Sequence, residues 1–252
     1  MKACSLFMVL TAAMCSPTLA FAEDSRCYEM RTYYANSDKL DALHARFRDH
    51  TVGLFEKHGM TNVGYWVPQD NTDNKLIYIL SYPSREAREA SWKAFLADPV
   101  WKAAYAESTK DGKLISKVES VFMQTTDYSP AIKPTVTDPA RLFELRIYTT
   151  NEGRLDGLNA RFRDHTTGLF EKHGLPQFGY WTPTEEADGR DNRLIYLLAV
   201  RDQATRDAGF KAFGADPEWK AARDASEANG KLLIKGGVQS IFLVPTDYSP
   251  AR

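Results

Sequence analysis

The sequence contains little cysteine and shows no excess of charge of either sign. Three cysteines occur in 252 residues, and 32 lysines and arginines stand against 33 acidic side chains. Nucleic-acid-binding proteins that neutralise phosphates usually carry a basic excess, so we expect no nucleic-acid partner. The sequence also has no glycine-rich phosphate loop and no Gly-x-Ser-x-Gly turn. Their absence disfavours phosphoryl transfer and triad hydrolysis.

The composition that remains is that of a globular protein. Hydrophobic residues make up 43% of the chain, aromatic residues 12% and charged residues 26%. These values exclude a disordered or collagen-like chain. The length suffices for one large domain or two ordinary domains with a well-buried core.

The first 22 residues have the layout of a secretory signal peptide. Lys2 supplies a positive charge, Ala3 to Met14 is mainly apolar, and Ala20 and Ala22 offer small residues to a signal peptidase. The apolar stretch is short for a membrane-spanning helix. A buried N-terminal helix is the alternative. We therefore expect cleavage near Ala22, a periplasmic or secreted location, and no integral membrane segment in the mature chain.

Cleavage at this site would leave Cys27 as the single thiol, because Cys4 and Cys15 precede it. One thiol cannot form an intrachain disulfide, so the exported protein must be stabilised by its core. Cys27 could join two chains, although a buried thiol in a strand is the favoured interpretation. The sequence thus allows an oligomer without specifying one.

An internal repeat organises the rest of the chain. Residues 46–59 (RFRDHTVGLFEKHG) return as residues 161–174 (RFRDHTTGLFEKHG), and residues 126–130 (TDYSP) return as residues 246–250. The repeat predicts a signal peptide at 1–22, a first unit at 23–130, a proline-bearing linker at 131–139 and a second unit at 140–252.

Each copy alternates between the periods of strands and helices. Residues 143–148 alternate in polarity as a strand does, whereas apolar residues between 40 and 54 recur at helical spacing. Taken along the chain, the pattern predicts a β-α-β-β-α-β unit of the α+β class. One such sheet leaves a face uncovered, and the second copy can cover it.

Several segments resemble the NIPSNAP family. They are residues 29–33 (EMRTY) and 144–148 (ELRIY), the two Gly-Tyr-Trp strands and the two Asp-Pro-x-Trp segments. The resemblance covers the mature chain twice and implies ferredoxin-like units paired as an intrachain version of a dimeric α+β barrel. Superfamily relatives include cofactor-free monooxygenases, cyclases, isomerases and haem enzymes. NIPSNAP proteins have no assigned reaction, so the resemblance supplies no catalytic residue. Their eukaryotic members are linked to mitochondria, whereas this N-terminus indicates export.

His50 and His165 are the candidate catalytic residues. His50 falls between Phe47 and Leu54 in the apolar stripe, so we expect it to point between helix and sheet, where an imidazole could move a proton. The alternative is a core histidine satisfied by a backbone carbonyl or a tyrosine hydroxyl.

The other histidines favour structural roles. His58 and His173 are expected in a last helical turn, where a cation interacts favourably with the helix dipole, and His44 is expected in solvent. His50 and His58 are eight residues apart, which is not a zinc-ligand spacing. We expect neither a metal nor a cofactor.

The Glu-x-Arg strands supply a second candidate site. If Phe143 and Leu145 face the helices, Glu144 and Arg146 face the other sheet, either as a structural ion pair, which is favoured, or as the lining of a polar cavity. Aromatic pairs on the neighbouring strands belong to the core or form the walls of an apolar site. The candidate ligand-binding residues are Arg31, Arg146, Tyr65, Trp66, Tyr180 and Trp181.

Three functional hypotheses follow. The first is an exported protein that binds a small hydrophobic or aromatic molecule. The second is a cofactor-independent monooxygenase, cyclase or isomerase-like enzyme that uses a cavity histidine. The third is a structural interaction module. An enclosed pocket favours the first two, and a filled core favours the third.

Overall fold

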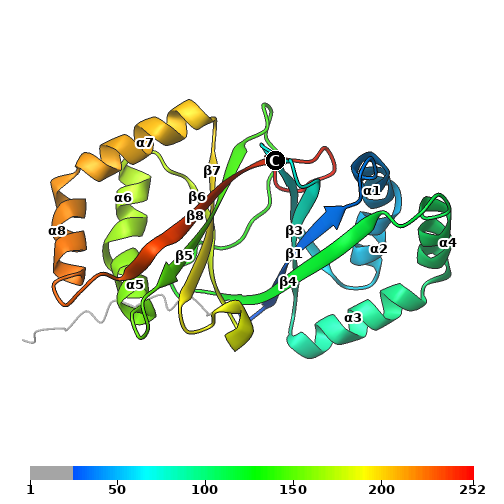
Figure 1. Ribbon diagram of the computed structural model, residues 1–252, viewed down its shortest axis with the longest axis horizontal. Coiled ribbons are helices and arrows are strands. Elements are labelled where there is room, and N and C mark those ends of the chain that lie inside the picture. The colour runs from blue at the N-terminus through cyan, green and yellow to red at the C-terminus, as the bar shows by residue number, and fades with distance from the viewer. Residues whose placement is uncertain (1–24) are drawn as a thin grey trace, which may run out of the picture.

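The computed structural model describes residues 25–252, which form two units of similar layout (Figure 1). The signal-peptide prediction falls on residues 1–22, outside the described residues. The first unit has the predicted β-α-β-β-α-β order. Its elements are β1 (Cys27–Ala35), α1 (Leu40–Arg46), a π-helical turn (Phe47–Thr51), α2 (Val52–Lys57), β2 (Thr61–Pro68), β3 (Lys75–Tyr82), α3 (Arg85–Ala97), α4 (Pro99–Ser108) and β4 (Ile115–Thr125).

The second unit repeats this order and adds a short 3-10 helix at Glu186–Asp188, in the insertion between its second and third strands. Its other elements are β5 (Leu142–Thr150), α5 (Leu155–Arg161), a π-helical turn (Phe162–Thr166), α6 (Thr167–Lys172), β6 (Gln177–Pro183), β7 (Arg193–Val200), α7 (Gln203–Ala215), α8 (Pro217–Ser226) and β8 (Leu233–Pro245).

The eight strands close into one antiparallel barrel in the order β1-β3-β2-β8-β5-β7-β6-β4. The units join where β2 pairs with β8 and where β4 pairs with β6. The helices of the two units lie on opposite sides of the barrel (Figure 1). The predicted fold, two ferredoxin-like units paired as an intrachain α+β barrel, is confirmed.

Side chains from both units fill the barrel interior. Trp66 and Trp181 are fully buried there. The ring of Trp66 lies 5.3 Å from that of Phe143, and the ring of Trp181 lies 5.9 Å from that of Tyr28. Each tryptophan therefore packs on a ring of the other unit, so neither unit can bury this core alone.

The strand faces are the reverse of those predicted. The alternation on β5 is present, but Phe143 and Leu145 point into the barrel, whereas Glu144 and Arg146 point toward the helices of their own unit. Because the barrel core covers one face and helices cover the other, both sets of side chains are buried. Hydrophobicity alone therefore could not tell the two faces apart.

The repeated Thr-Asp-Tyr-Ser-Pro segments each cross to the opposite unit. Ser129 Oγ accepts a hydrogen bond from the backbone N–H of Tyr180 (3.0 Å), and Ser249 Oγ accepts one from Tyr65 (2.9 Å). Tyr128 packs into the second unit's helix–sheet core, while the equivalent Tyr248 packs into that of the first. The two units thus hold each other reciprocally.

Candidate functional site

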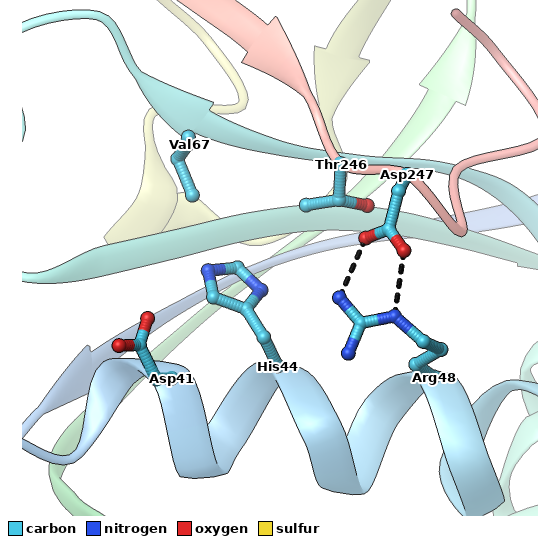
Figure 2. Close-up of a pocket in the computed structure, with 6 residues that line it drawn as sticks. All are labelled: Asp41, His44, Arg48, Val67, Thr246 and Asp247. Atoms are coloured by element: carbon cyan, nitrogen blue, oxygen red, sulfur yellow. Dashed lines mark hydrogen bonds and ion pairs between the residues drawn. The ribbon is translucent and has the colours of Figure 1, made fainter.

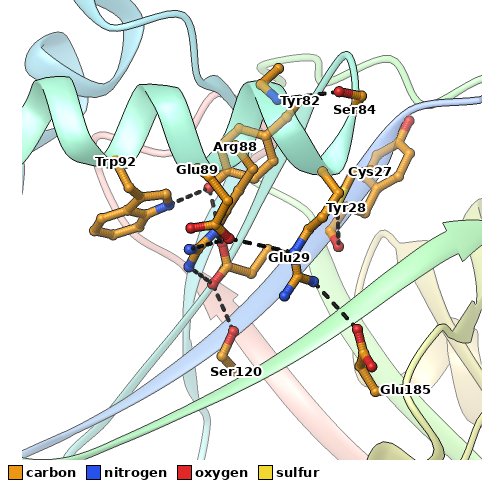
Figure 3. Close-up of polar contacts among 12 residues, drawn as sticks. Cys27, Tyr28, Glu29, Tyr82, Ser84, Arg88, Glu89, Trp92, Ser120 and Glu185 are labelled. Carbon is orange, nitrogen blue, oxygen red and sulfur yellow. Dashed lines mark hydrogen bonds and ion pairs between the residues drawn. The ribbon is translucent and has the colours of Figure 1, made fainter.

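The first Glu-x-Arg strand forms a buried ion cluster beneath α3 (Figure 3). The fully buried Glu29 carboxylate accepts hydrogen bonds from Arg31 (2.5 Å), Arg88 (2.8 and 3.0 Å), Ser120 (2.7 Å) and Tyr82 (3.0 Å). Burial by itself would raise the pKa of Glu29, but the Arg88 hydrogen bonds and the Arg31 charge lower this pKa to about 2. The favoured ion pair is present, on the helix side of the sheet.

The second unit repeats this cluster. Glu144 accepts hydrogen bonds from Arg146, from Arg206 (2.5 and 2.7 Å) and from Ser240 (2.6 Å). Arg31 also borders an open hollow of about 610 Å³ beside α3. Both arginines that are candidates for ligand binding are therefore held by a buried carboxylate of their own strand.

His50 and His165 are exposed, so the prediction that they point between helix and sheet is wrong. The cause is the π-helical turn at Phe47–Thr51, repeated at Phe162–Thr166. A π-helical turn holds more residues than an α-helical turn, and the buried stripe continues through Thr51 instead of His50. The proton-shuttle role of the two histidines stays a prediction. Such turns often occur at functional sites. The residues on the buried side of the π-helical turn are therefore candidates for a site.

His58 and His173 each connect two helices. His58 Nε2 lies 2.8 Å from the carboxylate of Asp98, the residue that caps the start of α4, and His173 lies 2.7 Å from Asp216 in the second unit. Hydrogen bonds from Lys57 and His58 hold the pKa of Asp98 well below its usual range. The end of α2 is thereby tied to the start of α4.

The candidate aromatic residues alternate between the two cores. Tyr65 faces the helices, where its hydroxyl bonds to Asn62, and Trp66 faces the barrel interior. Tyr180 and Trp181 repeat this arrangement. All four aromatic side chains are fully buried. They therefore belong to the packed core.

A partly open cavity of about 180 Å³ lies between helices and sheet in the second unit. Arg161, which is 5% exposed, donates from Nη1 to Glu227 Oε1 at 3.3 Å along its wall. Thr166, in the π-helical turn, donates to the carbonyl oxygen of Arg161 (3.1 Å). We call this space the second-unit cavity. Its lining residues are Tyr148, Arg161, Phe162, Thr166, Phe170, Phe213, Trp219, Arg223, Glu227 and Leu233.

A more open hollow of about 380 Å³ lies where the first unit meets the C-terminal segment (Figure 2). His44, expected in solvent, is half-buried here, and its Nδ1 lies 2.8 Å from the hydroxyl of Tyr248. Burial and the nearby charge of Arg48 lower the pKa of His44. We call this space the His44 hollow. It is lined by Asp41, His44, Arg48, Val67, Thr246 and Asp247.

The residues of the second-unit cavity are not among the site residues predicted from the sequence. Two features of the sequence could have indicated them. The repeated Asp-Pro-x-Trp segment places Trp219 in the lining, and position 223 differs between the copies, with Tyr105 in the first unit and Arg223 in the second. The lining residues are too far apart in the chain for spacing to connect them.

Within residues 25–252, no group of three or more His, Cys, Asp or Glu side chains is placed to hold a metal ion. The helices of the same range include none that is both long and apolar enough to cross a membrane.

Known proteins share this fold. A monooxygenase-like protein from Lactobacillus acidophilus superposes with a TM-score of 0.57 at 9% identity, over 88% of this chain and 94% of that one. A second monooxygenase-like protein, from Fusobacterium nucleatum, gives a TM-score of 0.56 at 10% identity, over 88% and 92% of the two chains. At such identities the likeness concerns the fold alone.

Sequence comparison is more specific. The NipSnap homolog of Dictyostelium discoideum is 24% identical over 164 residues, which make up 64% of this chain and 65% of that protein. The chain thus spans about two thirds of that relative's length. The NIPSNAP family model matches this chain twice, at residues 28–130 and 143–250. On these two matches, together with the paired barrel, the chain belongs to the NIPSNAP family.

Proposed function

We propose that this protein binds a small hydrophobic or aromatic molecule in the second-unit cavity. The observation that carries the proposal is a partly open space of about 180 Å³ whose walls include five aromatic side chains, those of Tyr148, Phe162, Phe170, Phe213 and Trp219, together with Leu233. Such walls suit a flat, apolar ligand.

The size of the cavity limits the ligand. An apolar cavity of about 150 Å³ in a protein core holds one benzene molecule. The second-unit cavity is only slightly larger, so it fits a single substituted ring and excludes large polycyclic molecules. The barrel interior is not a competing site, because Trp66 and Trp181 fill it.

The charges in the cavity favour a neutral ligand. Arg161 is already paired with Glu227, and the two side chains are 4% and 13% exposed. The other arginine of the lining, Arg223, donates to Asp224. A further anion beside Glu227 would meet a like charge in a poorly solvated place. A hydroxyl group, in contrast, could hydrogen-bond to either partner of the pair without adding charge.

Phenol is a suitable probe. We expect saturation-transfer NMR to show phenol binding to the wild-type chain, and Leu233→Phe to remove this binding by filling the cavity. Ile115 occupies the equivalent position in the first unit, pairing with Ala35 as Leu233 pairs with Thr150. Ile115→Phe is therefore the matched control and should retain binding. Equal phenol binding by both variants, or none by the wild type, would overturn the proposal.

The His44 hollow supports a second candidate, an enzyme that moves a proton without a cofactor. Burial and Arg48 keep His44 neutral near pH 7, and Tyr248 fixes one of its ring nitrogens. When Nδ1–H donates to Tyr248, Nε2 is free to accept a proton from a substrate carbon acid. Asn159 replaces His44 in the second unit. In this hypothesis His44, which lines a hollow, takes the proton-transfer role that was predicted for His50 from the sequence.

Deuterium exchange tests the second candidate. We expect the wild-type chain to accelerate exchange of the acidic C–H of 2-tetralone in D₂O, and His44→Asn, which copies the second unit, to remove the acceleration. Exchange that is equally fast with the variant, or no faster with wild type than with buffer, would exclude a base at His44.

We further propose that the protein acts after export. The proposal is supported by the charge, apolar stretch and small residues at positions 2–22. Intact-mass measurement of the protein from its native host should give a chain that begins at Glu23. A mass that retains residues 1–22 would refute export through cleavage.

A further inference from the structure

Arg46 of the first unit is a buried cation without a counter-charge. Only 4% of the residue is exposed, and its Nε has no hydrogen-bond partner among the described residues. Nη1 donates to Ser108 Oγ at 3.3 Å. No ion pair of Arg46 occurs within residues 25–252, and the titratable groups that act on its charge are tyrosines. A buried guanidinium in this state is costly unless an anion reaches it.

In the second unit, the equivalent arginine is paired with a carboxylate. Arg161 is the equivalent of Arg46 and is equally buried, but it donates to the carboxylate of Glu227 as well as to Ser226. Thr109 stands where Glu227 stands in the second unit, one residue after the repeated serine, Ser108. The two copies of this site therefore differ in the carboxylate of Glu227 and in the replacement of Arg223 by Tyr105.

The surroundings of Arg46 fit a flat organic group. Its guanidinium lies 5.3 Å from the ring centroid of Trp101 and 5.4 Å from that of Tyr105. Tyr105 is 47% exposed, so the ring beside the guanidinium also borders solvent. Exposed side chains change rotamer on the nanosecond timescale, so Tyr105 can admit a ligand without any movement of the backbone.

We propose that Arg46 is the anchor of a second binding site, which takes a small organic monocarboxylate. The carboxylate of the ligand occupies the place that Glu227 occupies in the second unit and pairs with Arg46, while Trp101 and Tyr105 flank its apolar part. A single guanidinium balances a single negative charge, so a monocarboxylate is preferred to a phosphate dianion. The site lies in the other unit from the second-unit cavity and does not depend on phenol binding there.

Calorimetric titration of the full mature chain with benzoate tests the proposal. We expect one benzoate site in the wild type and weaker binding of inorganic phosphate. Thr109→Glu supplies the missing carboxylate and should weaken benzoate binding by about tenfold or more, as expected for the loss of a hydrogen bond to a charged group. Thr109→Gln, which adds the same bulk without charge, is the matched control and should weaken it less.

The reciprocal variant provides an independent measurement. Glu227→Thr copies the first unit at this position and leaves Arg161 without its carboxylate, so it should create a second benzoate site, flanked by Trp219. Benzoate should also raise the thermal unfolding midpoint of the wild type and not that of Thr109→Glu. The proposal is wrong if the wild type binds no benzoate, if Thr109→Glu binds it as tightly as the wild type, or if Glu227→Thr gains no site.

Discussion

Asp247 accepts two parallel hydrogen bonds from Arg48, at 2.6 and 2.7 Å, across 199 positions of the chain (Figure 2). Asp127 holds Arg163 in the same way, at 2.7 Å for both bonds. Each aspartate belongs to the segment that ends one unit, and each arginine lies on the first helical segment of the other. The ion pairs are exposed and contribute little energy individually. They do help to set the alignment in which the two units pack together.

This reciprocal packing predicts that one unit alone is not a stable monomer. Residues 23–133, expressed by themselves, lose the strand partners of β2 and β4 and expose the barrel face around Trp66. We expect the fragment to self-associate, because a second copy of it can restore the barrel. Light scattering coupled to size-exclusion chromatography measures this. A soluble, folded monomer would show that the units are independent.

Replacing Glu29 by Gln should strongly destabilise the protein. The change leaves Arg31 and Arg88 beside a buried site with no carboxylate, and breaking a buried pair in this way costs about 3–5 kcal/mol. Chemical unfolding gives the free energy. Glu89→Gln, at an exposed carboxylate beside Arg88 on α3, is the control and should change stability by less than about 0.5 kcal/mol.

The same substitution should alter the acid dependence of stability. The pKa of Glu29 falls from 4.5 to about 2 on folding, so its stabilising contribution is complete above pH 4.5 and is lost as the pH falls toward 2. The wild type should therefore lose stability across this window, and Glu29→Gln should lose less. Parallel slopes for the two proteins would mean that the Glu29 cluster does not govern the acid response.

The contact between His44 and Tyr248 should weaken in mild acid. The folded-state pKa of His44 lies below its ordinary value of 6.5, so its contribution is present above pH 6.5 and is lost as the pH falls through the lowered pKa. Thermal unfolding between pH 7 and pH 5 should show this loss in the wild type and a smaller one in His44→Asn. Identical pH profiles would contradict the prediction.

Two glycines of the first unit should respond to alanine in opposite directions. A β-carbon at Gly64 would collide with the ring of Trp66, whereas one at Gly53, in α2, would meet nothing within 4 Å. Gly53→Ala should therefore stabilise the protein by about 0.5–1 kcal/mol, the gain expected in a helix, and Gly64→Ala should destabilise it by about 1–3 kcal/mol. Denaturation midpoints compare the two variants, and a shift in the same direction would count against the packing of Trp66.

Much of the architecture was predictable from the sequence because its signals are local or internal. The repeat of residues 46–59 at 161–174 revealed two equivalent units, and the alternation of strand and helix periods within each gave the β-α-β-β-α-β order. The need of each sheet for a cover then predicted the paired barrel. The Glu-x-Arg ion pair was also predictable, since a buried carboxylate requires a cation.

The direction in which each face of a strand or helix points depends on the tertiary structure. Alternation on a strand defines two sets of side chains, but Glu29 faces the helices only because Arg88 reaches it from α3. The π-helical turn at Phe47–Thr51 moved His50 from the predicted buried stripe to the surface, and no spacing in the sequence announces such a turn. The second-unit cavity likewise brings together side chains from distant segments.

The duplication, the order of elements and the barrel are therefore predictable from the sequence, because they depend on periodicity and on the burial that each sheet requires. The places where space and uncompensated charge remain depend instead on how distant segments pack together. The difference between Thr109 and Glu227 is visible in the sequence, but its meaning depends on the burial of Arg46 and Arg161. Burial is a property of the packed molecule, since it removes water from a group only when distant segments close around it.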